Sequence, residues 1–196
     1  MKKAMIGYQI YSAREDAEKD LFGTLKKIAE MGYDGVEFAG FYHYTVDEIK
    51  KALEESGLAA ISAHVPLAEI EKDMFKTISD YKAIGCKYIA VPYTDDECRP
   101  GGPRFAETIR NIYKFGRLCR EAGIQLLYHN HDFEFTKISG MYGLDFIYEA
   151  VDACTLKTEI DTCWVKYAGE NPAEYVKKYA GRCPVVHLKD YVGVKG

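Results

Sequence analysis

The sequence lacks the motifs of several common enzyme classes. Its six cysteines include no C-x-x-C pair, so neither a zinc knuckle nor a thioredoxin-like redox pair is indicated, and we expect free thiols. No glycine-rich phosphate loop of the Walker or Rossmann type occurs, and no G-x-S-x-G nucleophile elbow is present. No apolar run approaches the roughly 20 residues that span a bilayer.

Positive charge is also scarce. The formal net charge is −4 and the isoelectric point is near 5.8, which argues against non-specific electrostatic binding to nucleic acid. The N-terminus carries lysines, but the apolar run after them is too short for a signal peptide. We therefore expect a cytoplasmic protein with no nucleic-acid or membrane partner. Whether it forms a homo-oligomer is left open.

Short apolar runs alternate with longer amphipathic segments, and no interdomain linker separates them. The expected strands cover residues 4–9, 35–38, 59–64, 88–92, 124–129, 156–161 and 184–189. The expected helices cover residues 18–31, 46–56, 70–84, 104–122, 143–151 and 172–179. This order predicts βαβ units around a parallel sheet, with residues 1–196 forming one α/β domain.

In most of these strands, every second residue is polar, so that one face of the strand is polar and the other apolar. The polar residues are most frequent at the C-terminal ends. A doubly wound sheet would be apolar at both parities because helices cover both of its faces. The pattern therefore favours a TIM (β/α)₈-type barrel, whose catalytic residues gather at the C-terminal strand ends. Only seven strands are found, and a complete barrel typically needs about 250 residues. We expect strand eight and its helix to be missing, so that the barrel is C-terminally incomplete.

Three consecutive strand ends carry residues that bind metals. His129, Asp161 and His187 share the inward parity, and a nitrogen and oxygen set of this kind suits Mn²⁺, Co²⁺, Zn²⁺ or Mg²⁺. His131 lies on the same face as His129. Glu134, further along the segment Tyr-His-Asn-His-Asp-Phe-Glu-Phe, could reach back as a fourth ligand, bind substrate, or be a solvated loop carboxylate.

Further side chains at the strand ends suit catalysis or substrate binding. His131 and Glu134 are the candidates for proton transfer. Lys189 could polarise a substrate oxygen as a point charge, although an ion pair at the rim would explain it equally well. The candidates for substrate binding are Glu37, His64, Trp164 and Asp190. Ordinary packing is the alternative for Trp164, and a hydrogen-bonded core histidine for His64.

Five segments resemble the sugar phosphate isomerase/epimerase superfamily, which has a xylose isomerase-like TIM barrel. They are Gly-Tyr-Asp-Gly-Val-Glu-Phe, Ser-Ala-His, Tyr-His-Asn-His-Asp-Phe-Glu-Phe, Glu-Ile-Asp-Thr-Cys-Trp and Val-His-Leu-Lys-Asp. The resemblance implies a divalent metal held by residues of strands five to eight, with Asp161 and His187 at the positions of strands six and seven. His129 stands where ketose epimerases have glutamate, which is similar to the inosose dehydratase branch. The strand-eight glutamate has no counterpart, and Trp164 replaces a histidine that epimerases often have.

The chemistry that this resemblance implies is proton abstraction next to the carbonyl of a keto sugar, keto-inositol or related polyol. Returning the proton would give an isomerase or epimerase, and expelling a β-hydroxyl would give a dehydratase. Two other classes of protein are alternatives. A repair endonuclease with a metal cluster would need more than the five histidines present. A sugar-binding barrel without catalytic activity would not need to retain a metal.

Overall fold

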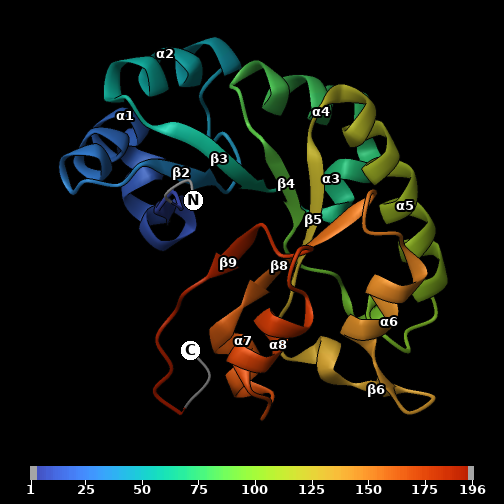
Figure 1. Ribbon diagram of the computed structural model, residues 1–196. Coiled ribbons are helices and arrows are strands. Elements are labelled where there is room, and N and C mark those ends of the chain that lie inside the picture. The colour runs from blue at the N-terminus through green and yellow to red at the C-terminus, as the bar shows by residue number, and fades with distance from the viewer. Residues whose placement is uncertain (1–3, 194–196) are drawn as a thin grey trace.

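The computed structural model describes residues 4–193, which form an open barrel of seven parallel strands with helices on the outside (Figure 1). The spatial order of the strands follows the chain, and each neighbouring pair is parallel. The strands are β1 (Gly7–Gln9), β2 (Gly35–Phe38), β3 (Ala59–His64), β4 (Tyr88–Val91), β5 (Gln125–His129), β8 (Leu156–Asp161) and β9 (Val185–His187). The predicted TIM-type barrel with seven strands is therefore confirmed.

Helices connect successive strands and cover the outer face of the sheet (Figure 1). They are α1 (Arg14–Glu30), α2 (Val46–Ser56), α3 (Leu67–Lys72), α4 (Met74–Ala83), α5 (Phe105–Ala122), α6 (Gly143–Ala150), α7 (Thr162–Tyr167) and α8 (Pro172–Lys178). Three short 3₁₀ turns add to these: η1 (Ile10–Ala13), η2 (Asp96–Cys98) and η3 (Phe133–Phe135). A small antiparallel hairpin, β6 (Lys137–Ile138) with β7 (Met141–Tyr142), lies between β5 and α6. Within residues 4–193, every helix is too short or too polar to cross a bilayer.

The alternation of side chains along the strands separates an apolar layer from a polar interior. Phe38 and Leu126 are fully buried in the hydrophobic core that the helices cover. Neighbouring residues of the opposite parity, among them Glu37, His129 and Glu159, are buried as well but are polar. Because successive side chains point to opposite faces of a strand, this second set converges inside the barrel.

The prediction of one continuous helix over residues 70–84 is wrong. The structure has two helices in this region, α3 and α4. Asp73 separates them with an extended backbone, and its side chain accepts a hydrogen bond from the backbone N–H of Lys76 at 2.9 Å, which caps α4. Helix α7 and the hairpin were not expected, because segments this short carry little periodicity.

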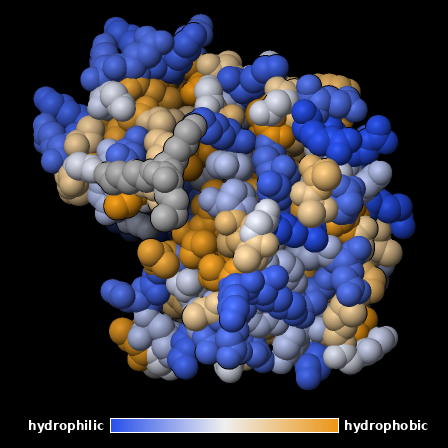
Figure 2. All heavy atoms as spheres, viewed as in Figure 1, coloured by the Kyte–Doolittle hydropathy of each residue, from blue (hydrophilic) through white to orange (hydrophobic). Residues whose placement is uncertain are grey.

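The barrel is open between its two edge strands, β1 and β9. Each of them pairs with one neighbour only among the described residues. Figure 2 shows apolar side chains gathered between the part that carries α1 and α2 and the part that carries α7 and α8. Ile6, before β1, and Leu188, after β9, are both largely exposed.

Candidate metal centre and substrate cavity

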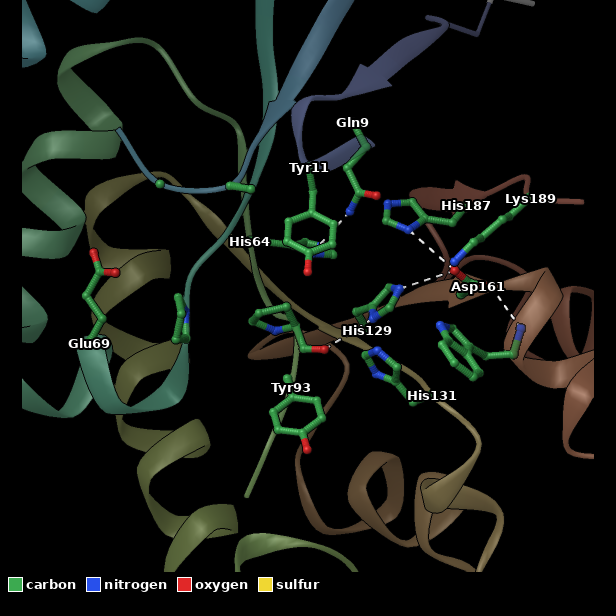
Figure 3. Close-up of a pocket in the computed structure, with 15 residues that line it drawn as sticks. Gln9, Tyr11, His64, Glu69, Tyr93, His129, His131, Asp161, His187 and Lys189 are labelled. Atoms are coloured by element: carbon green, nitrogen blue, oxygen red, sulfur yellow. Dashed lines mark hydrogen bonds and ion pairs between the residues drawn. The ribbon is translucent and has the colours of Figure 1, made fainter. Parts of the chain in front are cut away.

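A cavity of about 590 Å³ opens at the C-terminal ends of the strands (Figure 3). Seven of the residues singled out in the sequence line it: His64, His129, His131, Asp161, Trp164, His187 and Lys189. They come from four different strands or the segments just after them, which the parallel sheet brings to one end. Glu37, Glu134 and Asp190 do not line the cavity.

A network of carboxylates and imidazoles forms the floor of the site. The buried carboxylate of Glu159 places Oε1 2.6 Å from Nε2 of His64 and 3.0 Å from Nε2 of His187. Oε1 of Glu37 lies 3.1 Å and 3.0 Å from the same two nitrogens. Each of the two carboxylates therefore contacts both imidazoles.

Two further polar side chains hold Glu37 in place. The Ser62 hydroxyl donates a hydrogen bond of 2.5 Å to Oε2, and the Gln9 amide donates one of 2.9 Å to Oε1. Gln9, Ser62 and Glu159 are not among the site residues predicted from the sequence. All three have the inward parity of their strands, and this was the signal that could have included them.

Asp161 and two imidazoles form a second group of atoms beside this network, at longer distances. Nε2 of His129 is 3.4 Å from Oδ2 of Asp161, and Nδ1 of His187 is 3.8 Å from the same oxygen (Figure 3). Oδ1 of Asp161 accepts the backbone N–H of Trp164 at 2.9 Å, which fixes the carboxylate as the cap of α7. Oδ2 is thus directed to the two imidazoles. Donor atoms that share a cation at about 2.0–2.2 Å each are spaced in this way.

Burial and mutual attraction shift the protonation of the network. Burial lowers the pKa of His64 and His187, but the nearby carboxylates outweigh it, so the pKa of His64 is raised and that of His187 reaches about 12. Burial raises the pKa of Glu159, yet His64 and His187 hold it well below its usual range. His129 differs, since burial lowers its pKa. Its imidazole is therefore neutral, the form that binds metals.

Three buried atoms of the site lack a hydrogen-bond partner among residues 4–193: Nε2 of His129, Nδ1 of His131 and Oε2 of Glu159. Leaving such atoms unpaired costs about 1–3 kcal/mol each, unless a ligand completes them. The donor atoms of His64, His129, Glu159 and His187 all lie within 4.8 Å of one another. Imidazole nitrogens and carboxylate oxygens at this spacing fit a divalent transition metal.

Aromatic rings form the wall beside this centre. The His131 ring stacks on Phe133, with 5.4 Å between centroids and 6° between planes, and lies 4.9 Å from the Trp164 ring. Tyr93 meets the His131 ring edge-on at 5.7 Å. The Lys189 ammonium lies 5.4 Å from the centre of the Trp164 ring, at the rim of the cavity. Flat rings of this kind suit the C–H faces of a ring-shaped polyol.

Two of the candidates are held apart from the cavity. Glu134 is fully buried beneath the loop that follows β5, and its carboxylate accepts hydrogen bonds from Tyr128 and from the His131 backbone. Asp190 is exposed beyond β9. The side chains that converge are therefore those of strand ends β3, β5, β8 and β9, with Glu37 of β2 beneath them.

Comparisons with known proteins agree with this architecture. The family model of the xylose isomerase-like TIM barrel matches residues 25–196. An inosose dehydratase of Clostridium botulinum is 28% identical over 175 residues, which cover 79% of this chain and 58% of that protein. The chain thus spans less than two thirds of the length of the curated relatives it matches.

Solved structures show the same fold. A sugar phosphate isomerase/epimerase from Parabacteroides distasonis superposes with a TM-score of 0.83 at 25% identity, covering 96% of this chain and 79% of that one. A 3-keto-D-glucoside 4-epimerase from E. coli superposes with a TM-score of 0.69 at 17% identity, covering 96% and 80%. The second likeness concerns the fold alone.

Proposed function

The chain belongs to the xylose isomerase-like TIM barrel family, and from this premise we propose that it is a metal-dependent enzyme that abstracts a proton next to the carbonyl of a keto sugar or keto polyol. The observation that carries the proposal is the buried Nε2 of His129, which has no hydrogen-bond partner among the described residues and lies 3.4 Å from Oδ2 of Asp161, beside a cluster of imidazoles and carboxylates. Such a cluster in a cavity with aromatic walls is suited to a cation and a polyol together.

We assign the metal to His129, Asp161 and His187. The contacts of His187 support this choice, because Nδ1 faces Asp161 at 3.8 Å while Nε2 is 3.0 Å from Glu159. A histidine that binds a metal through one nitrogen commonly donates the other N–H to a carboxylate, which fixes the tautomer and the ring orientation. Glu159 and Glu37, each 3.0 Å from Nε2 of His187, share that supporting role. Mn²⁺, Co²⁺, Zn²⁺ and Mg²⁺ are the ions to test.

When bound, the metal would polarise the carbonyl and make the neighbouring C–H more acidic. His131 is the group that we assign to proton transfer. Its Nδ1 is buried without a hydrogen-bond partner among the described residues, and burial lowers its pKa to about 3, so the ring is neutral. Lys189 would hold a substrate oxygen at the rim, and Trp164 and Tyr93 would exclude water.

The fate of the proton decides the reaction. Its return to carbon would give epimerisation or isomerisation, and loss of a β-hydroxyl would give dehydration. Dehydration of a keto-inositol is the outcome that we would test first, because the curated relative from Clostridium botulinum is an inosose dehydratase. The 17% identity to a keto-glucoside epimerase supports no choice of substrate.

The experiment that tests the proposal is proton NMR in D₂O. The protein is stripped of metal, reloaded with each of the four ions, and mixed with a panel of keto-inositols and keto sugars. Deuterium incorporation next to the carbonyl, or loss of water from the substrate, with one of the metals is expected. Binding of none of the metals, together with no exchange in any substrate, would overturn the proposal and leave a barrel without catalytic activity.

A further inference from the structure

The loop after β5 carries His131 into the cavity. Its ring has aromatic neighbours, but Nδ1 has no hydrogen-bond partner among residues 4–193. Phe133 stacks on one side, and the rings of Tyr93 and Trp164 lie 5.7 Å and 4.9 Å away. Ring contacts of this kind restrict where the imidazole can lie, but they allow the loop beneath it to shift. The position of the ring along the cavity must therefore be set by the backbone.

Glu134 anchors that backbone. Its side chain is 0% exposed, and Oε2 accepts a hydrogen bond of 2.8 Å from the backbone N–H of His131. Oε1 accepts a hydrogen bond of 2.8 Å from the Tyr128 hydroxyl. One carboxylate thus ties the loop to the side chain of a residue within β5.

The other end of this connection is rigid. Tyr128 is 1% exposed and lies within β5, which pairs with β4 on one side and β8 on the other. Its backbone carbonyl also accepts a hydrogen bond of 2.9 Å from the hydroxyl of Tyr148 in α6. Glu134 therefore fixes the backbone of His131 relative to β5, at the centre of the sheet.

A carboxylate is a costly way to make this connection. Removing it from water is unfavourable, and only hydrogen bonds to its oxygens compensate. Burial raises the pKa of Glu134 to about 7. Residues that break the usual rules of burial without a gain in stability are typical of functional sites.

We propose that Glu134 is a positioning residue for the reaction, whose carboxylate holds the backbone of His131 so that the imidazole stays at the cavity. Direct contact of Glu134 with substrate is not compatible with its place, because both oxygens have partners and the side chain does not line the cavity. The catalytic consequence rests on the proposed function of His131, whereas the positioning itself can be measured without any substrate.

Two spectroscopic measurements report on the position. Trp164 is the only tryptophan of the chain, and its ring is 4.9 Å from that of His131, so its fluorescence responds to movement of the imidazole. The backbone N–H of His131 gives an NMR resonance that reports its hydrogen bond to the carboxylate. In Glu134→Ala, both signals are expected to change. In Glu134→Gln, whose amide oxygen can still accept that bond, both should stay close to wild type.

The matched control is Glu170→Ala. Glu170 also accepts a hydrogen bond from a tyrosine hydroxyl, that of Tyr142, but it has no contact with His131 and does not line the cavity. This variant should leave the Trp164 emission and the His131 resonance unchanged. Equal changes in Glu134→Ala and Glu170→Ala would mean a general loosening of the fold and would overturn the proposal.

Kinetics then tests the consequence. Glu134→Ala should lower kcat by up to about 100-fold, the cost of a displacement near 1 Å, with little change in KM or metal content. In a His131→Ala background the same substitution should cost almost nothing more, because both act through one imidazole. Additive losses would refute the assignment. If the wild type shows no turnover, the proposed function fails, while the spectroscopic result still decides whether Glu134 positions His131.

Discussion

The imidazole of His187 is held by Glu159 on one side, with Nε2 3.0 Å from Oε1, and faces Asp161 on the other. This arrangement makes the roles of two neighbouring acids distinguishable. Asp161→Asn should remove most of the bound metal, because a direct ligand is lost. Glu159→Gln should keep the metal and weaken its affinity by about 10–100-fold, the usual effect of losing a support.

Elemental analysis of the two variants after dialysis, with titration of the added metal, checks this prediction. Both variants keep the shape of the side chain, so a difference between them reports charge and ligation. The reverse order, with metal lost from Glu159→Gln and kept in Asp161→Asn, would move the metal to the group His64, His129, Glu159 and His187.

Loss of the Lys189 charge should lower turnover and leave the bound metal in place. Its ammonium lies at the rim, over Trp164, and is not among the grouped donor atoms. Lys189→Met keeps the length of the side chain and removes its charge. We expect turnover to fall by about 10-fold or more, as for the loss of one charged contact to a substrate oxygen, with the metal content unchanged.

The control for this prediction is Lys166→Met, at an exposed position of α7. It removes the same charge from the neighbouring helix. Steady-state kinetics of both variants separates a local contact from a general effect of net charge. Equal turnover of Lys189→Met and wild type would reject the role of Lys189.

The fold could be predicted from the sequence because its evidence is local. Alternation within each strand and amphipathic periodicity within each helix are properties of a few consecutive residues. The expected bounds of β2, β3, β8 and α2 coincide with the structure. The break at Asp73 was missed because an N-cap aspartate inside an amphipathic run looks like an exposed helical residue.

The site was only partly visible in the same way. Parity placed His129, Asp161 and His187 inside one end of the barrel, but their roles as metal ligands stay a prediction. The role of Glu159 depends on a contact across the fold, with His64. Spacing within a segment does not reveal which residue of another segment will face it. The burial of Glu134 could not be read from its place in a polar loop.

Helix α2 offers a test of local stability away from the site. Thr45 caps it: the hydroxyl accepts the backbone N–H of Glu48, and the Glu48 side chain accepts the backbone N–H of Thr45. Thr45→Ala should lower the free energy of unfolding by about 1 kcal/mol. Thr45→Ser keeps the hydroxyl, so its free energy of unfolding should stay within a few tenths of a kcal/mol of the wild-type value. Urea unfolding measures both, and equal losses would show that the cap contributes nothing.

The last prediction concerns the pH dependence of stability and follows from the burial of Glu134. Burial raises its pKa from 4.5 to about 7, against the opposing effect of its hydrogen bonds from His131 and Tyr128. Between these two values the folded chain keeps the proton that the unfolded chain releases. The free energy of unfolding therefore falls as the pH rises through this window, by about 3 kcal/mol in total at 1.36 kcal/mol for each pKa unit.

Glu134→Gln has no proton to lose, so its stability relative to wild type should rise by a similar amount between about pH 5 and about pH 8. Urea unfolding at both pH values measures the difference, and a constant gap between Glu134→Gln and wild type would show that Glu134 does not titrate in this range.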